Sequence, residues 1–158
     1  MSDETLLPPC GIYQTTKPIG EVPAGRFVYF HNHGNPGPGI YLPSRWVRNR
    51  AEFHAQGTTL HAPEDIGSLR GLAGEGLYRV LHAFDCCEKN CMRFEEDTLV
   101  TLGYDGNAGA ILFSPEMIEG ALVIPEQGTR IDDTRISNLR RLLVKEPRTA
   151  ESTHRVVH

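Results

Sequence analysis

The sequence lacks the long apolar runs of a membrane protein. No stretch approaches the roughly 18 to 20 apolar residues that a membrane-spanning helix requires. The first residues, Met1-Ser2-Asp3-Glu4, are acidic and have no apolar signal-peptide core. We therefore expect a cytoplasmic protein, in which the four cysteines are thiols or metal ligands rather than disulfides.

The sequence also lacks the familiar catalytic and cofactor motifs. It contains no phosphate-binding loop, no dinucleotide fingerprint, no Gly-x-Ser-x-Gly elbow and no His-Glu-x-x-His helix. The formal net charge is −4, so the basic field that a general nucleic-acid-binding protein needs is missing. These absences favour a non-catalytic binding or assembly module, whose partner is a protein or a second copy of itself rather than a nucleic acid or a membrane.

Turn-forming residues, in contrast, are abundant. Sixteen glycines and eleven prolines fall between short apolar runs. Such runs, punctuated by turn residues, are typical of all-β folds. We therefore predict a mainly β protein.

Two segments of the chain, 27–60 and 99–131, share one pattern. The alignment pairs Phe27 with Leu99, Ile40 with Ile111 after a one-residue gap, Trp46 with Met117, and Thr58 with Thr129. A shared period of about 65 residues indicates an internal repeat.

The repeat predicts two related, small barrel-like lobes, or one pseudo-symmetric barrel or sandwich built from both copies. The predicted parts are an extended lead-in (1–10), a first β lobe (11–60), a Gly- and Pro-rich linker (61–75), a second β lobe (76–131), a C-terminal helix (132–146) and a disordered tail (147–158). The amphipathic helix is predicted from the spacing of Ile136, Leu139 and Leu143 behind an Asp132-Asp133 cap.

Histidines distinguish the first copy from the second. Side chains two residues apart on a strand point to the same face, so His31 shares a face with His33, and Glu52 with His54. If the two strands are neighbours, these four side chains form a site for a divalent zinc, iron, manganese or nickel ion. A polar hairpin tip with hydrogen-bonded histidines is the simpler explanation.

The segment from Gly25 to His33 resembles the opening of the first cupin motif, a glycine followed after five residues by His-x-His. The glutamate that the motif carries three or four residues later is absent, and Gly37 and Pro38 stand there instead. The resemblance implies a mononuclear metal-dependent enzyme, which is the first alternative to the binding module.

The second copy carries a cysteine-containing loop that the first copy lacks. The spacing of His82, Cys86, Cys87 and Cys91 would allow three or four soft ligands to hold a structural zinc ion. Adjacent residues of an extended chain point to opposite sides, so at most one of Cys86 and Cys87 is expected to be a ligand. Ordinary reduced cysteines and a redox-active thiol pair are the alternatives.

Three arginines, Arg45, Arg48 and Arg50, surround Trp46. Such a cluster can hold phosphate or stack on bases, so a zinc-stapled nucleic-acid-binding module is the second alternative. The equivalent loop of the second copy carries glutamates instead. Because equivalent loops have opposite charge, we predict that the three arginines and Trp46 bind a partner, through head-to-tail contact between lobes or between molecules.

Overall fold

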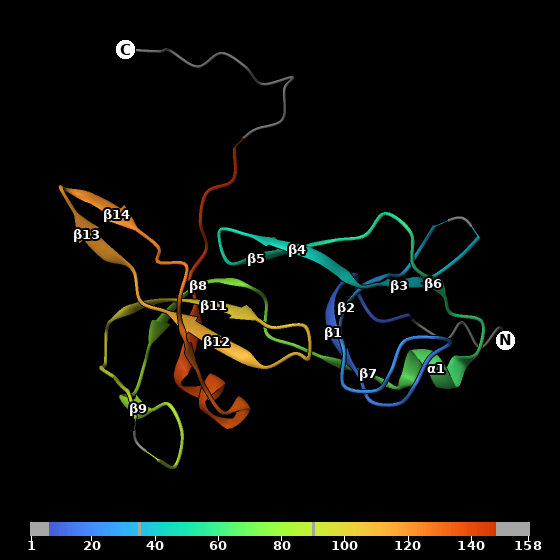
Figure 1. Ribbon diagram of the computed structural model, residues 1–158, viewed down its shortest axis with the longest axis horizontal. Helices are drawn as coiled ribbons and strands as arrows, with labels where there is room; N and C mark the ends of the chain where they lie inside the picture. The colour runs from blue at the N-terminus through green and yellow to red at the C-terminus, as the bar shows by residue number, and fades with distance from the viewer. Residues whose placement is uncertain (1–6, 35, 90, 148–158) are drawn as a thin grey trace, which may run out of the picture.

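The structure is a computed structural model that describes residues 7–34, 36–89 and 91–147. Within these residues the chain forms sixteen short β-strands, one α-helix and one 3-10 helix, so the all-β prediction is confirmed. The strands form two five-stranded sheets, one in each lobe, and three two-stranded hairpins (Figure 1). Neither described helix has the length and apolar character needed to cross a membrane.

The first lobe is built on a sheet with strand order β6-β3-β2-β1-β7. Its strands are β1 (Gly11–Thr15), β2 (Phe27–His31), β3 (Gly39–Tyr41), β6 (Thr58–Thr59) and β7 (Leu69–Gly71). Side chains of β2 alternate between two environments, as the two-residue period of a strand requires. Val28 and Phe30 belong to the core of this lobe, whereas Phe27 belongs to the core of the second lobe.

The second lobe has a sheet with strand order β15-β12-β11-β8-β16. Its strands are β8 (Gly76–Val80), β11 (Leu99–Tyr104), β12 (Ala110–Phe113), β15 (Thr129–Arg130) and β16 (Leu139–Arg141). Val100, Leu102 and Leu112 are its central buried residues. A short hairpin of β9 (Phe84–Asp85) and β10 (Arg93–Phe94) covers one end of this core, where Phe84 stacks on Phe94.

The two sheets have matching strand order and matching register. Gly11 pairs with Phe30 in the first sheet, and Gly76 pairs with Leu102 in the second. On the next strand, Ile40 faces Phe30 and Leu112 faces Leu102. Ile40 therefore corresponds to Leu112, one residue later than the sequence alignment predicts.

The extra residue of the first copy lies in a β-bulge. The hairpin of β4 (Pro43–Val47) and β5 (Arg50–Phe53) changes register between Pro43 and Arg45. The hairpin of β13 (Glu116–Ile118) and β14 (Ala121–Val123) pairs without a recorded shift. A bulge accommodates one unpaired residue, which explains why the one-residue gap falls here.

Each of these two hairpins turns on two residues with positive φ. Arg48 and Asn49 form the first turn, and Glu119 and Gly120 form the second. Consecutive positive φ values are the conformation of a tight type I′ turn. Figure 1 shows that β4–β5 extends over the second lobe, whereas β13–β14 projects away from the body of the molecule.

The predicted linker over 61–75 contains regular structure. It holds α1 (Pro63–Gly67) and strand β7 of the first sheet. Proline in the first helical turn favours the helix, and Leu69 pairs with Thr15 of β1. Residues 72–75 are the stretch of chain that connects β7 of the first sheet to β8 of the second.

The predicted C-terminal helix over 132–146 is not confirmed. The chain forms a 3-10 helix, η1 (Asp133–Asn138), and then β16, in which Leu139 pairs with Val80. Ile136 and Leu139 do pack on the core, but Leu143 is 94% exposed, so the apolar spacing does not continue along a helical face. Residues 148–158 of the predicted tail (147–158) and residues 1–6 of the lead-in lie outside the described residues.

Neither five-stranded sheet closes into a barrel within the described chain. The edge strands β6 and β15 have two residues each, and β7 and β16 have three. Barrel closure needs strands long enough to tilt and stagger around an axis. These edges are too short for that, so the barrel prediction is wrong and the lobes are open sheets.

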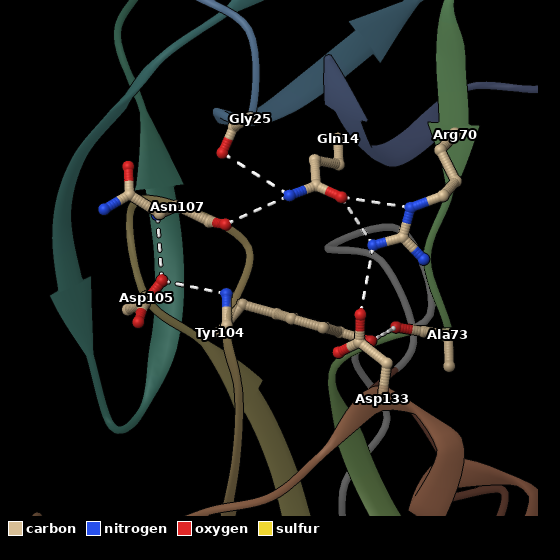
Figure 2. A network of polar contacts seen from close by, with 9 residues as sticks. Gln14, Gly25, Arg70, Ala73, Tyr104, Asp105, Asn107 and Asp133 are labelled. Atoms are coloured by element: carbon tan, nitrogen blue, oxygen red, sulfur yellow. Dashed lines mark hydrogen bonds and ion pairs between the residues drawn. The ribbon is translucent and has the colours of Figure 1, made fainter. Parts of the chain in front are cut away.

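A polar network joins the lobes (Figure 2). The side-chain amide of Gln14 donates to the carbonyl oxygen of Asn107 at 3.2 Å. The side-chain Oε1 of Gln14 accepts from the Nε of Arg70 at 3.0 Å, and Arg70 also forms an ion pair with Asp133 at 3.3 Å. Gln14 and Arg70 of the first lobe are thereby tied to Asn107 and Asp133 of the second.

Phe27 provides the apolar part of this junction. It is 0% exposed, and its ring stacks on Tyr104 with 5.4 Å between centroids. Its backbone N–H donates to the carbonyl oxygen of Gly106 at 3.0 Å. The hydroxyl of Tyr104 donates in turn to the carbonyl of Ala73, at 2.6 Å. The junction is therefore both packed and hydrogen-bonded.

Candidate metal centre

Cys10, His31 and His33 form a cluster of metal-ligating side chains at one end of the first sheet. One ligand atom from each lies within 4.8 Å of the other two. The pairing of Gly11 with Phe30 sets Cys10 opposite His31. The Cys10 Sγ lies 3.5 Å from the His31 Nδ1, and the two imidazole centroids are 4.0 Å apart.

These separations suit a tetrahedral metal ion. Zinc bonds of about 2.3 Å to sulfur and about 2.0 Å to nitrogen, at the tetrahedral angle, separate the two ligand atoms by about 3.5 Å. The distance of 3.5 Å between the sulfur of Cys10 and the His31 nitrogen already meets this requirement. One thiolate and two imidazoles would leave a fourth coordination position for another ligand.

Asn32 lies between the two histidines and contacts two members of the cluster. Its backbone N–H donates to the Cys10 Sγ at 3.3 Å, and its Oδ1 accepts from that thiol at 3.2 Å. The same Oδ1 lies 2.7 Å from the Nδ1 of His33. When Nδ1 carries the proton, it donates to Asn32 and leaves Nε2 available to a metal. Such outer contacts fix the orientation of metal ligands.

Of the four residues predicted to bind a metal together, the structure brings together His31 and His33 but not Glu52 and His54. Strand β5, which carries Glu52, pairs with β4 and not with β2. Glu52 forms an ion pair with Arg45 at 2.8 Å, and His54 lines a separate cavity. The condition that the two strands be neighbours is therefore not met.

Sequence reasoning missed Cys10, which the structure places beside His31 and His33 in the cluster. Cys10 lies in the lead-in, 21 residues before His31. The register of the first hairpin is the signal that could have found it. Pairing Tyr13 with Val28 carries Cys10 to the position opposite His31.

A cavity of about 480 Å³ opens between the lobes beside this cluster. Cys10 belongs both to the cluster and to the wall of the cavity. Ile12, Tyr29 and Phe53 are among its apolar lining residues, and Arg50, Glu75 and Arg141 are its charged ones. We call this cavity the inter-lobe cleft.

Glu75 is the buried acid of the inter-lobe cleft, with 8% of its surface exposed. Its Oε2 accepts a hydrogen bond from the N–H of Ala51 at 3.0 Å. Burial raises the pKa of Glu75, whereas that hydrogen bond and the charges of Arg50 and Arg141 act in the opposite direction. Two guanidinium groups around one carboxylate leave the cleft positively charged, which favours an anionic ligand.

The thiols of the β9–β10 loop form a second cluster. The Cys86 thiol donates to the Cys87 sulfur at 3.6 Å, because the chain bends after β9 and the two side chains do not point apart as predicted. The N–H of Lys89 lowers the pKa of Cys87, and the charge of Cys87 raises the pKa of Cys91. His82 is exposed and is not among the groups that act on these thiols.

The basic cluster is distributed over the β4–β5 hairpin. Arg45 is paired with Glu52, Arg48 lies in the turn, and Arg50 lines the inter-lobe cleft. Trp46 lies against the second lobe, in the wall of a cavity of about 290 Å³. Arg45 and Arg50 therefore have acidic neighbours within the chain, and the hairpin makes contact between lobes.

Comparison with known proteins provides no relative from which a function could be transferred. No protein-family model matches the chain, and neither curated proteins nor solved structures give a match. A function for this chain therefore has to come from the chemistry of its own residues.

Proposed function

We propose that this chain is a metal-binding module that holds Zn²⁺ through Cys10, His31 and His33. The observation that carries the proposal is the convergence of three ligand atoms within 4.8 Å. Sulfur and imidazole nitrogen are ligands that zinc prefers. Zinc sites with three protein ligands keep the fourth coordination position for a water molecule or another exchangeable ligand. The contacts of Asn32 support a preorganised site.

The inter-lobe cleft supports a role beyond that of a structural ion. Structural zinc sites usually have four protein ligands, whereas a site with three keeps a position for a further ligand. Cys10 lines the cleft, and Arg50 and Arg141 lie in its walls. A small anionic molecule is the ligand class that this charge favours. The same features would serve a metal-dependent enzyme, with Cys10 replacing Glu52 and His54 of the ligand set predicted from sequence.

We also propose that the two lobes are copies of one five-stranded unit. Matching strand order and register support this origin. By that register, the equivalents of Cys10, His31 and His33 in the second lobe are Glu75, Gly103 and Asp105. The metal ligands would then be a specialisation of the first copy.

Metal analysis of protein purified without an affinity metal or a chelator tests the zinc site. We expect a stoichiometric amount of zinc in the wild type, and loss of that metal in Cys10→Ser and His31→Ala. Cobalt substitution should give a thiolate-to-cobalt charge-transfer band that Cys10→Ser abolishes. His54→Ala is the matched control, because His54 lies outside the cluster and should retain the metal.

A Cys86→Ser/Cys91→Ser double variant distinguishes the two sulfur-containing clusters. If this variant alone loses the metal, the β9–β10 loop is the site and the proposal is wrong. Retention of metal in Cys10→Ser and His31→Ala would also contradict it. Circular dichroism confirms that each variant is folded before its metal content is compared.

A further inference from the structure

The β13–β14 hairpin carries an apolar surface that the rest of the described chain does not cover. Met117 is 68% exposed and Leu122 is 53% exposed. Their exposed apolar neighbours are Ile118, Val123 and Ile124. Met117 and Leu122 are a cross-strand pair on one face of the hairpin, and an exposed apolar surface of this kind marks an interaction site.

The β4–β5 hairpin shows what the equivalent element does in the first lobe. Trp46 pairs with Ala51 as Met117 pairs with Leu122, so Ala51 is the equivalent of Leu122. Ala51 is 9% exposed and packs in the core of the second lobe. Its N–H donates to Glu75 at 3.0 Å.

The tip of the β4–β5 hairpin is also seated on the second lobe. The side-chain amide of Asn49 donates to the carbonyl oxygen of Pro125 at 2.6 Å. The carbonyl of Asn49 lies so close to Gly103 that a Cβ there would be 2.8 Å from the oxygen. The β4–β5 hairpin is therefore a docking arm, and its tip lies on the face of the second sheet to which the Cα–Cβ direction of Gly103 points.

We propose that β13–β14 docks in the same way onto the first lobe of a second copy of this chain, so that copies associate head to tail. The receiving face consists of the positions equivalent to Glu75, Gly103 and Phe113. These are Cys10, His31 and Tyr41 in the first lobe. Phe113 is buried, whereas Tyr41 remains partly exposed, as expected of a face whose arm comes from another molecule.

The two proposed surfaces differ from the existing contact in a coordinated way. At the existing contact, Arg50 of the arm acts on the buried carboxylate of Glu75. At the proposed contact, the arm has Ala121 in place of Arg50 and the face has Cys10 in place of Glu75. Both partners of the charge pair are replaced together, so neither surface buries an uncompensated charge.

The tips differ in the same manner. The face gains the side chain of His31 where the second lobe has Gly103, and the arm loses a side chain where Gly120 replaces Asn49. The tip of the arm accordingly lies farther from the sheet in the contact between copies.

Sedimentation velocity over a range of protein concentrations tests the docking. We expect the mass of the wild type to increase with concentration, and Leu122→Lys to remain monomeric because a charge then lies on the arm. Leu143→Lys is the matched control, since Leu143 is exposed and lies outside the hairpin; it should associate as the wild type does. A wild type that is monomeric at every concentration would overturn the proposal.

A mixing experiment establishes the head-to-tail arrangement. Tyr41→Lys alters the face and leaves the arm intact, so it should be monomeric alone but should form a dimer with Leu122→Lys. Tyr29→Lys, on the neighbouring position of the same face, is used if Tyr41→Lys is not folded by circular dichroism. If Tyr41→Lys and Tyr29→Lys each still self-associate, the arm does not dock on this face. The proposal is also contradicted if a folded face variant forms no dimer when it is mixed with Leu122→Lys.

Discussion

Glu75 links the chemistry of a single residue to the stability of the whole chain. Burial raises its pKa, so the folded chain binds the carboxyl proton more tightly than the unfolded chain does. Protonation of Glu75 therefore favours folding. This contribution is fully present below the ordinary pKa of 4.5 and is lost as the pH rises through the raised value.

Glu75→Gln should accordingly stabilise the protein at neutral pH. The uncharged carboxamide avoids the cost of burying a charge, and its oxygen can still accept from the N–H of Ala51. We expect a higher urea midpoint for the variant at neutral pH, and a difference that shrinks as the pH falls through the raised pKa towards 4.5 and is absent below it. Urea unfolding across this pH range provides the measurement.

Glu52→Gln is the control for this effect, because Glu52 is exposed and its ion-pair partner, Arg45, is exposed as well. Its free energy of unfolding should match that of the wild type within about 0.5 kcal/mol across this pH range. A Glu75→Gln variant that is less stable than the wild type at neutral pH would show that Arg50 and Arg141 outweigh the burial.

The cluster of Cys10, His31 and His33 shows which residue contacts a sequence can predict. His31 ends β2, and His33 lies two residues later in the bend that follows the strand, so closeness along the chain keeps the two histidines together. Cys10 joins them through pairing between strands, and that requires the register of the first hairpin. Glu52 and His54 failed for the converse reason, because the spacing along β5 says nothing about which strand lies beside it.

At the scale of elements, the docking of the β4–β5 arm depends on Gly103. A Cβ at this position would lie 2.8 Å from the carbonyl oxygen of Asn49 and 3.2 Å from the ring of Phe113. Gly103→Ala should therefore lower the free energy of unfolding by about 1 to 3 kcal/mol, as overpacking commonly does. Gly67→Ala is the control, since nothing lies within 4 Å of its added methyl group and alanine favours the helix.

Chemical denaturation of both variants checks this prediction. Gly67→Ala should match the wild type or exceed it slightly. If Gly103→Ala is as stable as the wild type, the arm is not held closely against the sheet.

The elements that sequence predicted best are those with a strong strand pattern. Phe27 to His31 is rich in aromatic and β-branched residues, and it forms β2. Leu139 shows where the sequence pattern misleads. Its spacing from Ile136 suits a helix, yet Leu139 pairs with Val80 and belongs to the edge strand β16. The similarity of Ile66 and Leu69 to Ile136 and Leu139 was the overlooked signal.

At the scale of the whole molecule, the shared core predicts that the two lobes unfold together. Phe27 belongs to the first sheet but is buried in the core of the second lobe. Differential scanning calorimetry should give one transition whose calorimetric and van't Hoff enthalpies agree. Two resolved transitions would mean that the lobes are independent.

Phe27→Ala tests the same coupling from the opposite direction. Removing a fully buried ring that stacks on Tyr104 should cost about 3 to 5 kcal/mol. Val47→Ala, at an exposed position of the hairpin, should change stability by less than about 0.5 kcal/mol. A loss at Phe27 as small as that at Val47 would contradict a shared core.

The sequence signal behind the predicted two-lobe organisation is the recurrence of Gln-Gly-Thr at equivalent positions. Whether each sheet closes into a barrel could not be predicted, because closure depends on the lengths of edge strands such as β6 and β15. Each of these strands has only two residues, which is too short for an alternating apolar pattern to reveal its length in the sequence. Short edges leave the sheets open.

Trp46 is the chain's one tryptophan, and the fold places it where the lobes meet. Its ring lines a cavity together with Tyr104 and Phe113 of the second lobe. Its fluorescence emission therefore depends on whether the arm is seated. The protein carries an intrinsic optical probe of its own junction, which allows lobe separation to be followed in solution without a label.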